Sequence, residues 1–141
     1  MSFSKFIKMY DNTLDQIIVK LTSVNISWCD LITQSGIAAL SQGCRKLKSF
    51  ISKVKFYDNE KLQTYNYLQG CLHIGDEALY NLARFCSQLE VINVQGCRNI
   101  QDEGMAALCD GCPNIKYMCI SNCPHLTDQS LVQDILSLKK I

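Results

Sequence analysis

The chain has 141 residues, 48% of them apolar and 19% charged, which is the composition of one folded domain rather than of a disordered chain. A formal net charge of +1 favours no class of charged partner, and the aromatic residues are not interleaved with basic ones as a single-strand nucleic-acid platform requires. The sequence has no run of about 18 apolar residues and no apolar signal segment before Asp11, so we expect no membrane span, no secretion and no nucleic-acid partner.

The amino-terminal half predicts an irregular start followed by one ordered unit. Residues 1–10 match no repeated pattern and stay an unassigned segment, whereas residues 11–141 predict a solenoid of about four units. The first unit is shortened, because Asp11 and Cys29 are closer in sequence than the matching pair Asp76 and Cys97 in a later unit. The next unit is regular from Cys29, with apolar or thiol side chains at Ile37, Leu40, Cys44 and Leu47.

An irregular insertion near residues 52–67 follows this unit. Cys44 and Cys71 lie more than twice as far apart in sequence as the matching pair Cys86 and Cys97, so a segment has been added between them. We expect the added segment to interrupt the strand that begins after Lys48. Two interpretations stay open: a functional loop over the binding face, or sequence that is foreign to the repeat.

The stretch from Leu68 to Leu131 contains one pattern twice and starts it a third time. Its period of about 26 residues is typical of stacked repeats. Another helix is predicted after it, with apolar residues at Leu131, Ile135 and Leu138. Four columns keep one spacing: Cys71, Cys97 and Cys123; Cys86 and Cys112; Ile74, Ile100 and Leu126; Asp76, Asp102 and Asp128.

Each unit is predicted to be a strand, a turn and a helix. Ile92 and Val94, at alternate positions, put both side chains on one face of a short strand. Met105, Leu108 and Cys112 have the spacing of a helix that packs one stripe inward, and Asp102 supplies a favourable charge or cap at its start. Such a unit cannot bury its apolar face alone, so neighbouring units must stack.

The pattern C-x-x-[IL]-[TG]-D-x-x-[LM]-x-x-L-x-x-x-C-x-x-L-x-x-L-x-L-x-x-C resembles the cysteine-containing leucine-rich repeat of the F-box/leucine-rich-repeat proteins. Residues 24–47 are similar to early repeats of that family, and the resemblance covers roughly residues 11–138. It implies an α/β fold, a short solenoid with parallel strands on the concave face and helices on the convex face. It also implies a substrate receptor of an SCF-type ubiquitin ligase, although no F-box is found in residues 1–23.

Nine cysteines, an odd number, do not suggest a disulfide framework, since most of them fall on repeat columns. Stacked buried thiols suit a reducing compartment, so we expect a cytoplasmic chain, or alternatively a nuclear one. Cys109, Cys112, Cys119 and Cys123 could suggest zinc, but the two pairs are closer than in most zinc sites and two of the four are explained by their columns.

No catalytic or cofactor site is expected. His73 and His125 share a turn position two repeats apart and have no common carboxylate to orient them. The column of Asp76, Asp102 and Asp128 is explained by helix starts, and no glycine-rich phosphate loop is present. The sequence therefore predicts a chain that is not an enzyme and that has no cofactor and no metal.

The concave strand face is the predicted binding surface, because solenoids of this kind use it to hold protein partners. The candidate contact residues are Asn25, Ser27, Trp28, Val91, Asn93, Gln95, Tyr117, Cys119 and Ser121. Val91 and Tyr117 are apolar or aromatic where a solvated strand prefers polar residues. We expect a protein-recognition module that holds a protein substrate, with SCF subunits as further partners if an F-box lies upstream. The alternative is an F-box-less scaffold or competitor, for example in cell-cycle signalling.

Overall fold

The computed structural model describes residues 20–27, 32–52, 55–56, 68–69 and 73–128. Several predicted features lie outside these residues: Asp11 of the shortened first unit, Trp28, Cys29, Cys71, the central part of the insertion, and the helix with Leu131, Ile135 and Leu138. No helix in the described part of the chain has both the length and the apolar character that crossing a membrane requires.

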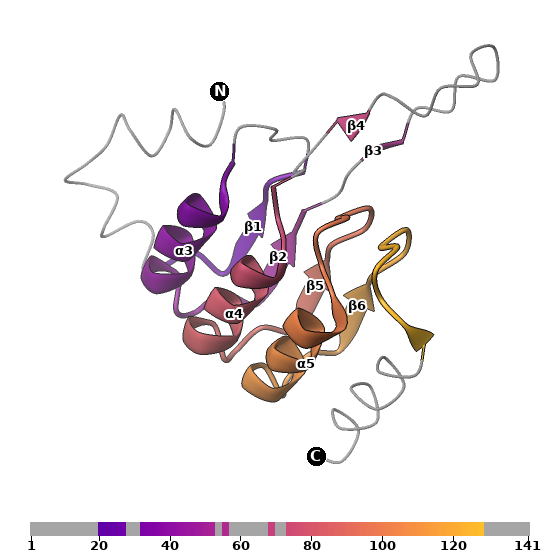
Figure 1. Ribbon diagram of the computed structural model, residues 1–141. Coiled ribbons are helices and arrows are strands. Elements are labelled where there is room, and N and C mark those ends of the chain that lie inside the picture. The colour runs from indigo at the N-terminus through magenta and orange to yellow at the C-terminus, as the bar shows by residue number, and fades with distance from the viewer. Residues whose placement is uncertain (1–19, 28–31, 53–54, 57–67, 70–72, 129–141) are drawn as a thin grey trace, which may run out of the picture.

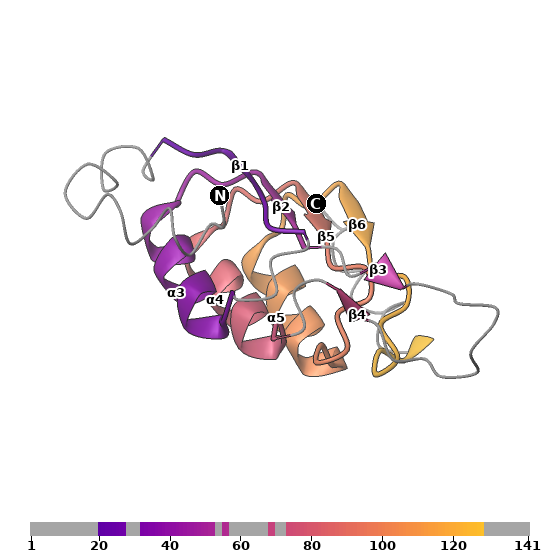
Figure 2. The ribbon, with the colours of Figure 1, turned by 90° about the horizontal axis from the view of Figure 1, so that it is seen from above.

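Four short parallel strands form the main sheet, in the order β1 (Ser23–Asn25), β2 (Ser49–Ile51), β5 (Val91–Asn93) and β6 (Tyr117–Cys119). Three helices, α3 (Gln34–Gly43), α4 (Asp76–Phe85) and α5 (Asp102–Gly111), connect them and lie side by side in a second layer (Figure 1, Figure 2). The prediction of a short α/β leucine-rich-repeat solenoid, with strands on one face and helices on the other, is confirmed.

Each helix begins and ends where the repeated pattern places polar and thiol residues. The hydroxyl of Thr33 accepts a hydrogen bond from the N–H of Gly36 at the start of α3, whereas α4 and α5 begin with an Asp-Glu pair that suits a helix amino terminus. All three helices end at a cysteine whose N–H donates to the carbonyl four positions earlier, in Cys44, Cys86 and Cys112. One cysteine column is thus the helix carboxyl-terminal cap.

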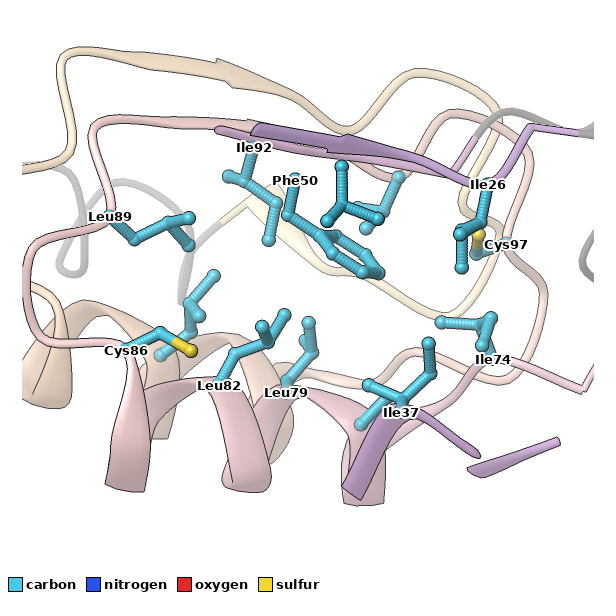
Figure 3. Packing of buried hydrophobic residues seen from close by; sticks show 14 of the residues in the cluster. Ile26, Ile37, Phe50, Ile74, Leu79, Leu82, Cys86, Leu89, Ile92 and Cys97 are labelled. Carbon is cyan, nitrogen blue, oxygen red and sulfur yellow. The ribbon is translucent and has the colours of Figure 1, made fainter. Parts of the chain in front are cut away.

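The core lies between the sheet and the helices (Figure 3). Phe50 and Ile92 point from the strands toward Leu79 and Leu82 of α4, and all four side chains are fully buried. Removing this apolar area from water is the main force that holds neighbouring units together. The described column residues that were predicted to be buried, from Ile37 to Leu47 and from Ile74 to Cys112, belong to this one cluster.

The insertion leaves the strand of its unit intact, so the prediction that it interrupts the strand is wrong. Residues Ser49–Ile51 pair in register with β1 on one side and with β5 on the other. The extra chain departs after Ser52, which is fully buried. Its two ends, β3 (Lys55–Phe56) and β4 (Leu68–Gln69), pair as an antiparallel ribbon beyond the main sheet (Figure 1). The added residues therefore enter at a turn, where they break no ladder hydrogen bond.

Tight turns follow β5 and β6 at matching positions. Gly96 has φ 80°, and Asn122, at the same position of the next repeat, has φ 58°. Only glycine adopts this left-handed conformation at no steric cost, and asparagine is among the few other residues that tolerate it. The repeat therefore dictates a turn geometry as well as a pattern of buried side chains.

Candidate protein-binding surface

The concave face is the face of the main sheet that lies away from the helices. Strand alternation puts Val24, Phe50, Ile92 and Met118 toward the helices, so the residues on either side of them face outward. These outward residues form rows across the sheet because the strands are in register: Ser23, Ser49, Val91 and Tyr117; Asn25, Ile51, Asn93 and Cys119; and, just past the strands, Ser27, Gln95 and Ser121.

None of the described side chains in these rows is charged, although 19% of the whole chain is charged. The position of the third row that follows β2 lies outside the described residues. Among the described residues of this face, charged side chains lie where the strands begin. There the carboxylate of Glu90 lies 3.9 Å from the ammonium of Lys48 and 3.3 Å from that of Lys116. The concave face thus offers hydroxyl, amide and apolar groups to a partner, with a small charged cluster at one edge.

An apolar patch lies on the concave face around Tyr117, Val91 and Ile51. Tyr117 is 54% exposed, and its register neighbour in the first row is Val91, which is half-buried. Ile51, also half-buried, lies in the second row on the strand that pairs with β5. Exposed aromatic residues beside apolar neighbours are frequent energetic anchors of protein interfaces.

The predicted contact residues do not all reach the surface. Asn25 is exposed, but Asn93 retains only 6% of its accessible surface, so the prediction that Asn93 is an exposed contact residue is wrong. The side-chain oxygens of both residues accept a hydrogen bond from the N–H two positions later, in Ser27 and Gln95, at 3.0 and 3.1 Å. These amides shape the turn after each strand.

Cys119 takes the same position in the last strand. Its sulfur lies 3.4 Å from the hydroxyl oxygen of Ser121, so thiol and hydroxyl take the place of the contact between Asn93 and Gln95 in the preceding strand. Cys119 is half-buried and Ser121 is exposed. Both are accessible on the concave face, as are Gln95 and Ser27, whereas Trp28 lies outside the described residues.

Sequence reasoning missed Ser49 and Ile51, because it assumed that the insertion broke their strand. The signal was present: Leu47, Phe50 and Ser52 take the three apolar positions of the strand motif, with an aromatic and a hydroxyl residue in place of the usual aliphatic ones. Ser52 is tolerated there because its hydroxyl lies 3.8 Å from the sulfur of Cys97, which satisfies part of a buried polar group.

The described thiols of the cysteine columns are buried between units, where their sulfurs contact backbone carbonyls. The sulfur of Cys86 donates to the carbonyl of Cys44 at 3.5 Å, and that of Cys112 donates to the carbonyl of Cys86 at 3.3 Å. Burial raises the pKa of Cys44 and Cys86 to about 11 and that of Cys112 to about 12. Such thiols are neutral at physiological pH and hence poor nucleophiles and poor metal ligands.

The other cysteine column repeats this arrangement at the opposite end of the helices. The sulfur of Cys97 donates to the carbonyl of Ser52 at 3.4 Å, and that of Cys123 donates to the carbonyl of Val94 at 3.2 Å. Within the described ranges, no group of three or more His, Cys, Asp or Glu side chains is placed to hold a metal ion. The exposed His73 and His125 belong to no such group.

The aspartate column joins each unit to the next. The carboxylate of Asp76 accepts from the N–H of Gln101 at 2.7 Å. That of Asp102 accepts from both the N–H and the hydroxyl of Thr127, each at 2.8 Å. A helix-start charge was predicted for these residues, but the hydrogen bond to the following unit was not. Asp76 and Asp102 are therefore structural braces, and their carboxylates are already engaged.

Comparison with known proteins agrees with this architecture. The family described as Leucine Rich repeat matches residues 19–41 and 85–109. The solved structure of Leiomodin-1 Actin-Binding Site 2 (ABS2) superposes with a TM-score of 0.60 at 13% sequence identity, covering 94% of this chain and 73% of that one. At this identity the likeness concerns the fold. The chain folds as a short α/β leucine-rich-repeat solenoid.

Proposed function

We propose that this chain is a protein-recognition module that holds its partner on the concave face. The observation that carries the proposal is the 54% exposed ring of Tyr117 in the apolar patch, on a face whose described rows hold no charged side chain. An extended surface of this kind suits a protein segment rather than a small ligand, which would need an enclosing pocket. The module acts by binding and not by catalysis.

For the biological role, we propose the substrate-binding part of an SCF-type ubiquitin ligase receptor, working in the cytoplasm or the nucleus. The resemblance of the cysteine-containing repeat pattern to F-box/leucine-rich-repeat proteins supports this role, and the buried thiols suit a reducing compartment. The second candidate is an F-box-less scaffold or competitor in cell-cycle signalling, which would use the same concave face without ligase subunits. Actin binding, which the name of the structural neighbour states for that protein, is not carried over at 13% identity.

The concave face is tested with two matched tyrosine variants. Tyr117→Ala removes the exposed ring of the concave face, and Tyr80→Ala removes the 43% exposed ring on helix α4, on the other side of the molecule. Both changes occur on the surface and should alter the free energy of unfolding by less than about 0.5 kcal/mol. Quantitative proximity labelling in cells should show partners whose recovery falls at least about fivefold with Tyr117→Ala only, the size expected for losing an aromatic anchor.

Equal loss of these partners with both variants, or with neither, would contradict binding on the concave face. The ligase role is then examined on the same partners. A receptor should copurify with the cullin and adaptor of the ligase, and its depletion should lengthen the lifetime of a partner that depends on Tyr117. Partners that bind through Tyr117 without any change in lifetime would favour the scaffold or competitor.

A further inference from the structure

The two long edges of the solenoid carry opposite charge. We define the helix-end edge as the edge where helices end and strands begin, and the helix-start edge as the opposite one. In the described part of the chain, the helix-end edge has six basic and two acidic residues: Lys20, Arg45, Lys46, Lys48, Arg84 and Lys116, with Glu90 and Asp110. The repeats place five acidic residues and one basic residue on the helix-start edge: Asp76, Glu77, Asp102, Glu103 and Asp128, with Arg98. Lys55 of β3 lies beyond this edge, outside the repeats.

The helix-end edge contains an aromatic-cationic cluster made of Arg45, Phe85 and Arg84. Arg45 follows the end of α3, whereas Arg84 and Phe85 are the last two residues of the neighbouring helix α4. The guanidinium carbons of Arg45 and Arg84 lie 5.5 Å and 5.2 Å from the centre of the Phe85 ring. Each cation is within the range where the face of an aromatic ring attracts it.

This cluster presents positive charge that the described part of the chain does not neutralise. Lys48 and Lys116 share the carboxylate of Glu90, but no ion pair to a carboxylate is found for Arg45 or Arg84 among the described residues. The Nε of Arg45 donates to the carbonyl of Gln42 at 3.4 Å, which fixes the side chain while leaving its terminal nitrogens for other acceptors. Both arginines and the adjacent Lys46 are exposed.

The negative carboxyl end of a helix dipole attracts positive charge, which explains a single basic residue such as Arg84 in a last turn. It does not explain why two guanidinium groups from different repeats lie against one ring. Planar guanidinium groups held by a ring are prepared to form paired hydrogen bonds with carboxylates, since little side-chain entropy is left to lose on binding.

We infer that this cluster is a second docking surface, for a short acidic segment of a partner protein. The segment would place glutamate or aspartate carboxylates on Arg45 and Arg84. Glu90 and Asp110 lie on the same edge, so a long uniform polyanion such as a nucleic acid would meet negative charge beyond the cluster. A short acidic segment avoids both. This surface is distinct from the uncharged concave face and does not depend on what that face binds.

The test uses the full chain and a fluorescein-labelled peptide of about ten residues in which glutamate alternates with glycine. Fluorescence anisotropy gives its Kd, which should rise as salt screens the exposed charges over a Debye length of about 10 Å at 0.1 M. The double variant Arg45→Gln and Arg84→Gln should weaken binding at least about tenfold, and Phe85→Leu should weaken it less, by about two- to threefold.

Arg98→Gln is the matched control, because it removes one exposed positive charge from the helix-start edge, and Arg84→Gln removes one from the cluster. The inference predicts weaker binding for Arg84→Gln alone, with Arg98→Gln unchanged within about twofold. Thermal unfolding of each variant checks that the solenoid is intact. Three results would overturn the inference: equal weakening by both single variants, equal binding of a peptide with glutamine in place of glutamate, or tighter binding of a single-stranded oligonucleotide of matched charge.

Discussion

Neighbouring helices of this solenoid meet in two different ways. At the α4–α5 contact, Gly104 and Gly111 face Asp76 and Ala83 so closely that an added Cβ atom on either glycine would overlap its neighbour. At the α3–α4 contact, the residues one repeat earlier are Ala78 and Phe85. The first contact is closed by glycines, and the second must accommodate side chains.

The polar link between units changes with the contact. Across the glycine-lined contact, the short carboxylate of Asp76 reaches the N–H of Gln101 at 2.7 Å. Across the other, Gln34 occupies the aspartate column, and its longer amide reaches the N–H of Ala78 at 3.1 Å. The shorter Asp76 side chain thus spans the contact lined by glycines, and the longer Gln34 side chain spans the contact lined by larger residues. Each helix is linked to the next unit even though the linking residue differs.

Alkaline pH should weaken both helix contacts, and of the changes predicted here it should lower the free energy of unfolding most. The buried thiols of Cys44, Cys86 and Cys112 have pKa values of about 11, 11 and 12, raised first of all by desolvation. The unfolded chain ionises these thiols at a lower pH than the folded chain does, so stability is intact below pH 8 and falls as pH rises through 9 toward 11. We expect a loss of about 1 kcal/mol per thiol between pH 8 and 10.

Urea unfolding at a series of pH values measures this loss. The variant Cys112→Ala should show a shallower slope than the parent protein above pH 8, because one of the three thiols is gone. An unchanged slope would mean that other groups dominate the alkaline loss.

Gly104→Ala should break the contact between α4 and α5 only. The new Cβ would overlap the carboxylate of Asp76 and approach its Cα to 2.9 Å, so the helices must separate. Overpacking of this kind costs about 1–3 kcal/mol in the free energy of unfolding, measured by urea denaturation. The control is Gly36→Ala at the same position of α3, where the nearest described side-chain atom is Ile32 Cγ2 at 3.8 Å. That change should be neutral or stabilising, by up to about 1 kcal/mol.

The polar links between units should differ in strength, because one consists of two hydrogen bonds to a carboxylate and the other of one hydrogen bond to a neutral amide. Asp102→Ala removes two bonds to Thr127 and should cost about 1–2 kcal/mol, because a charged acceptor is lost. Gln34→Ala removes one neutral bond to Ala78 and should cost about 0.5–1 kcal/mol. Chemical denaturation of both variants at pH 7 gives the comparison, and a larger cost for Gln34→Ala would contradict the ranking.

Periodic features of the fold could be predicted from the sequence, and features that depend on contact between units could not. Burial of Ile92, Met105 and Cys112 follows from spacing alone, because their columns must face the core. A strand was predicted to begin after Lys48, but its continuity through Ser49–Ile51 was not, since Phe50 and Ser52 replace the aliphatic residues of the motif. The brace from Asp76 to Gln101 was missed because its geometry depends on how closely two helices pack.

The same division applies to the candidate binding surface: residues placed by strand periodicity could be predicted, and residues placed by contacts between side chain and backbone could not. Alternation along a strand places Val91 and Tyr117 outward, and both are accessible. Alternation also predicted Asn93 outward, but its side chain turns back to the N–H of Gln95 and is buried. The Arg45–Phe85–Arg84 cluster joins residues from two helix ends that are far apart in sequence, across an insertion that hides their common phase.

The point at which the insertion enters has a consequence for the order of folding. Contacts between the units of α4 and α5 join residues 25 to 30 positions apart, such as Asp76 with Gln101 and Cys112 with Leu82. Those across the insertion join residues 42 to 45 apart. Closing the longer loop costs only about 0.5 kcal/mol more in chain entropy. The shorter closures should nevertheless form first, so residues 73–128 are expected to be the folding nucleus onto which the amino-terminal repeat docks.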